Sequence, residues 1–198
     1  MCSIVWKWIK SMLCCGGGEL PVESKENHPT TTVVSESILS GITDDTLDYF
    51  SLKDVKTHGK IVDIYDGDTC TCILNVFNNY YKFKIRLADI DTPEIKNKIV
   101  IKKTMAYVAR NRLYNLITGD IIDNFESRNS VREKLQKNNY IVKLYCGDFD
   151  KYGRLLAFVF NKDFNITNKE IDKKVSFNYT LINEKLAVYY DGGAKEDN

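Results

Sequence analysis

Three short polar motifs hold the carboxylates and arginines with which this chain could bind a cation or grip an anion. They are DGDT at residues 66–69, DTPE at residues 91–94 with Arg86 shortly before it, and DKYGR at residues 150–154. Taken singly, each motif is also typical of an ordinary turn or helix start with solvated charges. A functional interpretation therefore depends on whether the surrounding elements bring the three motifs together.

The segments around the motifs predict the strands of a β-barrel, because they are rich in β-branched and aromatic residues and are separated by polar turns. Asn78 and Asn79 give a tight-turn signal between the second and third strands. In the third strand Lys82, Lys84 and Arg86 alternate with apolar residues, so we expect Arg86 to point away from the core. The strands are expected at residues 58–66, 69–77, 80–89, 140–146 and 155–160.

Two helices accompany these strands. Apolar residues recur at helical spacing over residues 101–117 and are followed by Gly119, which is typical of a helix end. Ser176 is suited to cap a second helix that runs to about Ala187. A short peripheral helix is expected within residues 44–50. The plan matches a five-stranded Greek-key barrel of the OB type plus two helices, an α+β fold, and such barrels serve many functions.

The three motifs, in this order, resemble the signature of the staphylococcal nuclease (thermonuclease) family. That signature is a D-G-D-T turn, an R-x-x-x-x-D-T-P-E run and a D-K-Y-G-R turn, and all three are complete here. The similarity runs from about His58 to Tyr190 and is interrupted by a polar insertion at residues 120–139. The insertion could be a substrate-facing loop or surface padding, and its composition favours padding.

The resemblance implies a calcium site. Asp68 and Asp91 correspond to the carboxylates that hold the ion, and Thr92 corresponds to the residue that adds a backbone carbonyl. Calcium takes oxygen ligands and tolerates waters, so two carboxylates, a carbonyl and the substrate phosphate make a reasonable open site.

The resemblance also assigns the catalytic residues. Glu94 corresponds to the residue that orients or deprotonates the attacking water, while Arg86 and Arg154 correspond to the arginines that grip the scissile phosphate. Lys151, Tyr152 and Tyr190 are expected to contact substrate, although a choice of gap leaves Tyr189 open in place of Tyr190.

The activity that follows from the resemblance is calcium-dependent endonucleolytic hydrolysis of DNA and RNA, with single strands preferred. The products are expected to carry 3′-phosphate and 5′-hydroxyl ends. Sugar specificity should be loose, because the site as described contacts phosphate, metal and a stacked base. We expect the protein to act as a monomer.

The formal net charge of +1 hides an uneven distribution. Residues 19–57 are acidic and have the Gly, Pro, Ser and Thr content of a linker, whereas the nuclease-like domain expected at residues 58–193 is mildly basic. Residues 194–198 form a short tail. A basic domain suits a polyanionic ligand without proving one, and the acidic linker could shield its cleft.

The spacing of the cysteines matches no disulfide framework, which suggests a reducing compartment. Cys70 and Cys72 share one face of a predicted strand, and buried reduced thiols are favoured there over a zinc pair, because no second pair completes the site.

The leader at residues 1–18 is apolar, contains two tryptophans and two lysines, and is too short and interrupted to span a bilayer. An intracellular protein attached to a membrane surface through acylated Cys2, Cys14 or Cys15 fits this composition as well as an unstructured leader does. Secretion is not excluded.

A non-catalytic alternative is a nucleic-acid or protein binding module of the same fold, tethered to a membrane. Such a module would be expected to have lost at least one of the catalytic residues, so the complete motifs argue against it. A calcium-regulated membrane attachment through the leader is a further hypothesis.

Overall fold

The structure is a computed structural model of the 198-residue chain, and it describes residues 39–167 and 170–193. These residues belong to one unit, Ser35–Asn198. Within this part of the chain no helix is long and apolar enough to cross a membrane. The leader, its candidate acylation sites Cys2, Cys14 and Cys15, most of the linker and the tail lie outside the described residues, so the expectations about them stay predictions.

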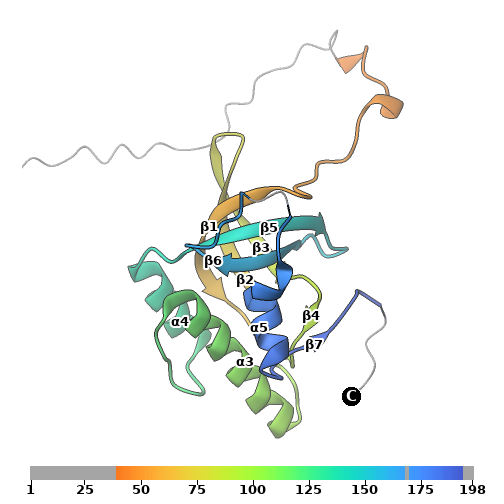
Figure 1. The fold of residues 1–198 in the computed structure, drawn as a ribbon. Coiled ribbons are helices and arrows are strands. Elements are labelled where there is room, and N and C mark those ends of the chain that lie inside the picture. Colours follow the sequence, from red (N-terminus) through yellow and green to blue (C-terminus); the bar gives the residue numbers. More distant parts are fainter. Residues whose placement is uncertain (1–38, 168–169, 194–198) are drawn as a thin grey trace, which may run out of the picture. The chain divides into compact units, whose positions relative to one another are not determined.

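Five strands close into a barrel in the order β1-β2-β3-β6-β5 (Figure 1). Neighbouring strands are antiparallel, except that β3 and β6 run parallel. The closed barrel confirms the predicted five-stranded OB-type fold. The strands are β1 (Lys56–Ile64), β2 (Thr69–Val76), β3 (Asn79–Leu87), β5 (Ile141–Phe149) and β6 (Leu155–Asn161).

The β2–β3 hairpin turns one residue earlier than the asparagine pair predicts. Phe77 and Asn78 both have positive φ, at 52° and 62°, which is the requirement of a two-residue hairpin turn that follows the strand twist. Asn79 already begins β3. Further along β3 the predicted alternation holds, because Ile85 and Leu87 are fully buried in the barrel.

Three free cysteines pack inside the barrel. Cys70, Cys72 and Cys146 are all buried, and burial raises the pKa of Cys70 and Cys146 to about 12. Thiols of this kind are unreactive and pack as small hydrophobic side chains. Among the described residues no group of three or more His, Cys, Asp or Glu side chains is arranged for a metal ion.

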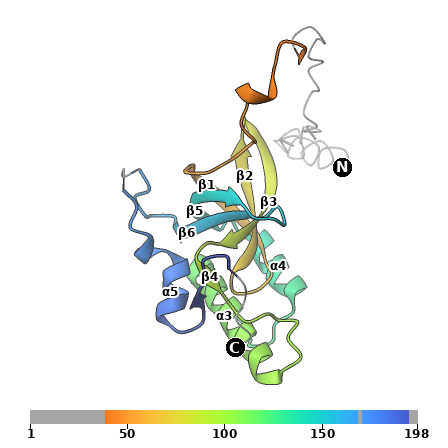
Figure 2. The ribbon, with the colours of Figure 1, turned by 90° about the vertical axis from the view of Figure 1, so that its right-hand side faces the viewer.

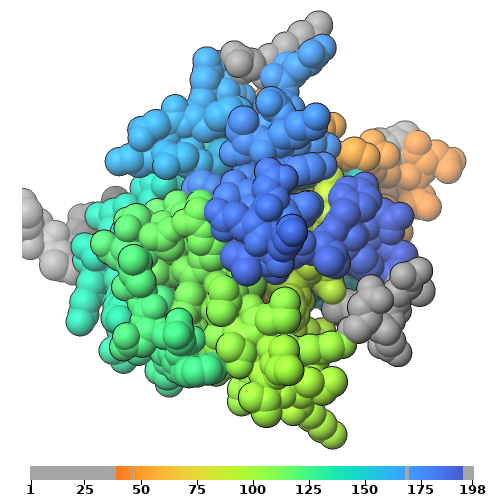
Figure 3. Space-filling view, turned by 60° about the horizontal axis from the view of Figure 1, so that its bottom comes forward, coloured from red at the N-terminus to blue at the C-terminus, as the bar shows by residue number. Residues whose placement is uncertain are grey.

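The helices lie together at one end of the barrel (Figures 1 and 2). In the space-filling view the blue residues of the C-terminal part lie against the green residues of α3 (Figure 3). A two-stranded ladder pairs β4 (Ile90–Asp91) with β7 (Val188–Tyr189), which brings the C-terminal segment beside the second motif. The helices are α3 (Val100–Thr118), α4 (Arg128–Lys137) and α5 (Phe177–Asn183), with short 3-10 turns η1 (Asp44–Thr46) and η2 (Lys173–Val175).

Two residues predicted to mark helix ends do so, one after the last residue of α3 and one before the first residue of α5. Gly119 ends α3 with φ of 81°, and the Ser176 hydroxyl accepts a hydrogen bond from the Tyr179 amide. However, α5 ends at Asn183 rather than near residue 187, because Lys185 takes a positive φ of 61° and the chain turns into β7. The peripheral helix expected within residues 44–50 is only the turn η1.

The prediction of two helices was wrong, because the insertion at residues 120–139 contains α4. Its interpretation as surface padding was also wrong. Val131 and Leu135 are fully buried, and α4 packs against β1. The helix starts where Ser127 accepts a hydrogen bond from the Ser130 amide. Two apolar residues one turn apart are enough to fix the helix on the barrel, but they are too few to produce a visible periodicity.

The apolar series predicted within residues 101–117 of α3 is only partly buried. Ile101, Met105 and Val108 are 72%, 45% and 41% exposed. Ala109 and Leu113 of the same series have no exposed surface, nor has Ala106, and α3 packs against α5. Alanines at buried positions allow close approach of the neighbouring backbone.

Candidate active site

One cavity of about 560 Å³ gathers the residues of all three motifs. Its walls come from the β1–β2 turn, from β3, from β4 and the loop after it, from the β5–β6 turn, and from the segment after β7. Every residue that the sequence predicts for catalysis, metal binding or substrate contact lines it. These residues are Asp68, Arg86, Asp91, Thr92, Glu94, Lys151, Tyr152, Arg154 and Tyr190.

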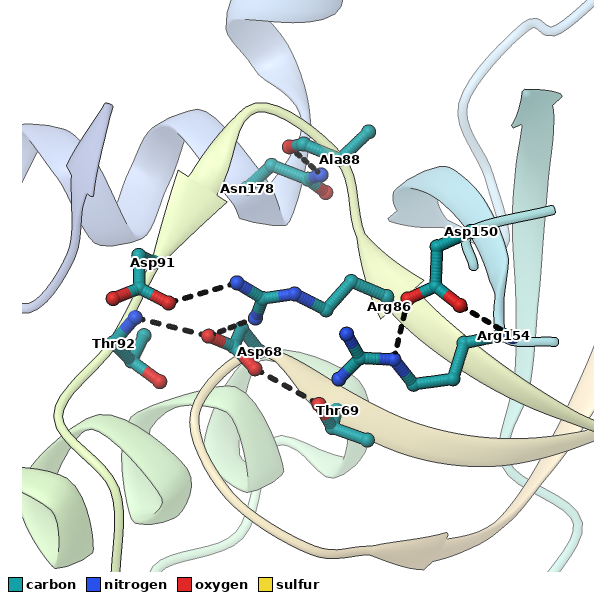
Figure 4. A network of polar contacts seen from close by, with 9 residues as sticks. All are labelled: Asp68, Thr69, Arg86, Ala88, Asp91, Thr92, Asp150, Arg154 and Asn178. Atoms are coloured by element: carbon teal, nitrogen blue, oxygen red, sulfur yellow. Dashed lines mark hydrogen bonds and ion pairs between the residues drawn. The ribbon is translucent and has the colours of Figure 1, made fainter. Parts of the chain in front are cut away.

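Asp68 is the most buried carboxylate of the site, with 3% of its surface exposed. It accepts hydrogen bonds from the Thr92 amide at 2.9 Å and from the Thr69 hydroxyl at 2.9 Å, and it pairs with Arg86 (Figure 4). Burial alone would raise the pKa of Asp68, but the Arg86 charge and these hydrogen bonds outweigh it and lower the pKa. Asp68 therefore stays ionised inside the protein.

Gly67 is required at this turn by close packing. A Cβ atom built there would lie 2.7 Å from the Cβ of Ala109 and 2.9 Å from the Cγ2 of Thr92. Both distances are shorter than real carbon contacts, so any side chain would push α3 and the second motif away from Asp68. The glycine of the DGDT motif thus lets the first two motifs meet.

Arg86 lies between two carboxylates. Its Nη2 donates to Asp91 Oδ1 at 2.8 Å and its Nη1 contacts Asp68 (Figure 4). The expectation that Arg86 points away from the barrel core holds, but the side chain is buried by the loops, with 7% of its surface exposed. Burial alone would lower the pKa of Arg86, and the charges of Asp68 and Asp91 reverse this and raise it.

The oxygen atoms around Arg86 fit a calcium ion by chemistry. Asp68 and Asp91 approach one guanidinium closely enough that both contact it, so the pair already holds one cationic group. Thr92 is buried beside them, and its Oγ1 has no hydrogen-bond partner among the described residues. Carboxylate and carbonyl oxygens are the donors that calcium prefers, with waters completing its shell.

Arg154 is positioned by the turn of the third motif. Asp150 accepts hydrogen bonds from the Tyr152 amide at 2.9 Å, the Arg154 amide at 2.8 Å and Arg154 Nε at 2.6 Å. Burial would raise the pKa of Asp150, but the hydrogen bonds from Arg154 lower it. Gly153 takes the positive φ of 74° that closes the turn. Asp150 thereby orients the guanidinium of Arg154 through Nε.

The remaining predicted residues form the rim. Glu94 is exposed and follows β4, while Tyr152 is 71% exposed and lies under the ammonium group of Lys151, 5.2 Å from its ring centre. Tyr190 lines the cavity, its amide donates to Asp89 and its hydroxyl donates to the Gly193 carbonyl at 2.7 Å. Tyr189 belongs to β7 and is not among the residues that line the cavity.

Asp66 is a residue of the site that the sequence analysis did not single out. It is 7% exposed, and its Oδ1 has no hydrogen-bond partner among the described residues. Burial, and secondarily the charge of Asp68, raises its pKa from 3.8 to about 7. The available signal was its place in the DGDT motif, two residues before Asp68. Lys84 and Thr69 also line the cavity without having been predicted.

Asn178 ties the helical layer to the strands that carry the site. Its side chain accepts from the Val159 amide at 3.0 Å and donates to the carbonyls of Ala88 at 2.8 Å and Ala157 at 3.1 Å. Figure 4 shows the contact of Asn178 with Ala88 above Asp68 and Asp91. The side chain is fully buried, so the N-x-T triplet that starts at Asn178 serves packing.

Comparison with known proteins agrees with this geometry. No curated protein matches the chain. A family model described as staphylococcal nuclease homologue matches residues 84–198, which is more than half of the sequence. The match contains the second and third motifs, while the DGDT turn precedes it and is joined to them by the barrel. The chain belongs to the family of staphylococcal nuclease homologues.

Proposed function

We propose that this protein is a calcium-dependent endonuclease that hydrolyses phosphodiester bonds in DNA and RNA and leaves 3′-phosphate and 5′-hydroxyl ends. The observation that carries the proposal is the single cavity lined by all nine predicted site residues. Membership of the nuclease homologue family supports the same class of reaction. A non-catalytic binding module would not need two arginines, three aspartates and an exposed glutamate around one cavity.

Arg86 and Arg154 are the proposed phosphate ligands. Attack on phosphorus builds negative charge on the non-bridging oxygens, and a guanidinium offers paired donors to two of them. Arg154 is held through Nε by Asp150, which leaves its terminal nitrogens for the substrate. Arg86 is held by Asp68 and Asp91, so it has to exchange at least one carboxylate contact for the phosphate.

Glu94 is the proposed residue that orients or deprotonates the attacking water. It lies on the cavity rim and is exposed, so water reaches it directly. A general base must lie within hydrogen-bond reach of the proton that it removes. The proton of the water would pass to a Glu94 carboxylate oxygen as the new oxygen–phosphorus bond forms. The bond to the 5′-oxygen would break, and that oxygen would take up a proton from solvent to leave as the 5′-hydroxyl.

Asp68, Asp91 and the Thr92 carbonyl would hold the calcium ion. When bound, the ion would supply positive charge beside the phosphate and help to neutralise the charge that develops there. Asp68 is ionised despite its burial, because its lowered pKa keeps the carboxylate charged at neutral pH.

The exposed rim favours single-stranded substrates. Tyr152 presents an aromatic face beside Lys151, and Tyr190 lines the same cavity. Unpaired bases stack on aromatic side chains at a gain of about 1–3 kcal/mol per base, whereas bases in a duplex are not available for stacking. The side chains proposed to contact substrate do not require or reject a 2′-hydroxyl, which supports action on both DNA and RNA.

The test is cleavage of a labelled single-stranded DNA by the full-length protein in calcium. Removing calcium with a chelator should abolish cleavage, and Glu94→Gln and Arg154→Ala should each lower kcat by about 100-fold or more. Glu133→Gln and Arg132→Ala, two exposed positions on α4, make the same changes in charge away from the cavity and should retain activity. Equal activity in all four variants would reject the proposed site.

A further inference from the structure

A second cavity continues from the candidate active site toward the insertion. It has a volume of about 430 Å³ and shares five lining residues with the first cavity, namely Asp66, Thr69, Lys84, Glu94 and Arg154. Its other wall is formed by Tyr65, by Lys96 in the loop after β4, and by Arg128 at the start of α4. The two cavities are therefore adjoining parts of one groove, with the scissile-phosphate ligand Arg154 at their junction.

Arg128 is held rigidly at this wall. Its Nε donates to Asp63 Oδ1 at 3.2 Å, its Nη2 contacts Asp63 Oδ2, and its guanidinium lies 4.7 Å from the ring centre of Tyr65. The Asp63 side chain is 8% exposed, whereas that of Arg128 is 48% exposed. Among the described residues the hydrogen bonds of this guanidinium go to Asp63, so the Nη1 group and the outer face of the plane remain for a ligand.

The insertion itself is fixed to α3, which keeps Arg128 in place. Arg110 is 1% exposed and donates to the Glu126 carbonyl at 2.8 Å. Asn111 donates to the carbonyls of Asp123 at 3.0 Å and Asn124 at 3.2 Å. These contacts connect α3 to the segment that leads into α4, so Arg128 lies on a positioned element.

Four basic and two acidic side chains line this second cavity. Lys84 and Lys96 are exposed, Arg128 is half exposed, and Arg154 is shared with the first cavity. Exposed lysines and a fixed guanidinium are the groups that contact nucleic-acid phosphates, and an open guanidinium plane is a stacking surface for an unpaired base. The groove thus offers phosphate and base contacts beyond the scissile bond.

We propose that this second cavity binds the nucleotide next to the scissile phosphodiester, on the side of the site away from Lys151 and Tyr152. Arg128 and Lys96 would contact the neighbouring phosphate. The insertion would then extend the substrate-binding groove, and would not be only a surface element. This inference rests on the proposed nuclease function. It makes the protein prefer chains of several nucleotides to a dinucleotide.

The test compares binding of a labelled single-stranded octanucleotide and a labelled dinucleotide by fluorescence anisotropy, in chelator so that hydrolysis does not intervene. Arg128→Gln and Lys96→Gln should each weaken octanucleotide binding about 3- to 10-fold and weaken dinucleotide binding less. The slope of the logarithm of the binding constant against the logarithm of the salt concentration should fall by about the share of one phosphate contact. Arg132→Gln and Lys98→Gln are the matched controls, since both positions are exposed and neither lines the cavity.

One further variant and one parallel assay keep the outcomes distinct. Arg128→Lys keeps a cation beside the buried Asp63 and should recover part of the affinity, while Lys96→Gln removes an exposed side chain and should leave folding intact. Equal losses for both lengths, or losses no larger than those of the controls, would overturn the subsite. If the wild type failed to cleave in calcium while the variants still showed the length-dependent losses of binding, the hydrolytic function would fall and the subsite would stand.

Discussion

The guanidinium of Arg86 donates from Nη2 to Asp91 Oδ1 at 2.8 Å while its Nη1 contacts Asp68, so one arginine joins the two acids assigned to calcium. The same side chain is assigned to the substrate phosphate. In the proposed function, a calcium ion that enters between the acids would displace these contacts and free the guanidinium for the phosphate. Metal binding and phosphate binding would thereby be coupled through one residue.

Arg86→Gln should therefore increase the stabilisation that calcium provides. In the variant the two carboxylates lose their internal cation, so the metal-free protein is less stable and the metal competes with no guanidinium. The measurement is the rise in melting temperature on addition of calcium, which should be larger for Arg86→Gln than for the wild type. Arg132→Gln serves as the control for net charge. A smaller rise in the variant would contradict the coupling.

Asp66→Asn should stabilise the protein more at alkaline pH than at acid pH. The pKa of Asp66 is raised from 3.8 to about 7, so the folded state binds its proton more tightly than the unfolded state does. Its contribution to stability is complete below the unfolded pKa and is lost as the pH rises through the folded pKa. Asparagine stays neutral at every pH, so the variant does not lose this contribution to stability.

Melting temperatures without calcium, at about pH 5 and about pH 8, check this sign. The difference between Asp66→Asn and the wild type should grow toward the higher pH. Asp163→Asn, at an exposed position, should show no such growth. A difference that shrinks with rising pH would mean that Asp66 is not held in the buried, poorly hydrated environment described here.

Asp150→Ala should lower cleavage without removing any group that contacts the phosphate. The carboxylate holds the Arg154 guanidinium and two amides of the turn, so its loss leaves Arg154 free to move. A misplaced phosphate ligand costs about 10- to 100-fold in kcat. Steady-state cleavage of single-stranded DNA checks this, with Asp148→Ala as an exposed acidic control on β5. Unchanged kcat would mean that Arg154 needs no support from Asp150.

Asn178→Ala should destabilise the fold by roughly 2–4 kcal/mol, because it leaves one amide and two carbonyls without their side-chain partner in a buried position. Denaturant unfolding of the variant and of Asn183→Ala, an exposed position at the end of α5, measures the difference. Equal stability of the two variants would refute the role of Asn178 in joining the layers.

The strands and the site motifs could be predicted because their signals are local. Alternation in β3 predicted the burial of Ile85 and Leu87, and Gly119 predicted the end of α3. That Asp68, Arg86 and Arg154 would share a site was implied instead by the resemblance of the three motifs to the family signature. For the strand and the helix end, a few neighbouring residues determine the backbone conformation, which is the information that a single sequence carries most directly.

The features that were missed depend on contacts between distant residues. Arg128 meets Asp63 across 65 positions of the sequence. The helix α4 shows only Val131 and Leu135 as buried apolar residues, so it looks like surface in the sequence. The exposure of Ile101, Met105 and Val108 on α3 was also missed, because a local pattern does not show which apolar residues the rest of the fold covers. The periodicity of a single sequence does not show which distant residues will contact each other in the fold.

The most direct test of the central claim is the chemistry of the product ends. A defined single-stranded oligonucleotide would be incubated with full-length protein in calcium, and the fragments would be weighed by mass spectrometry beside those from Glu94→Gln. We predict fragments with 3′-phosphate and 5′-hydroxyl ends from the wild type and almost none from the variant. Intact oligonucleotide with the wild type, or the same fragments at the same rate with Glu94→Gln, would contradict hydrolysis at this site.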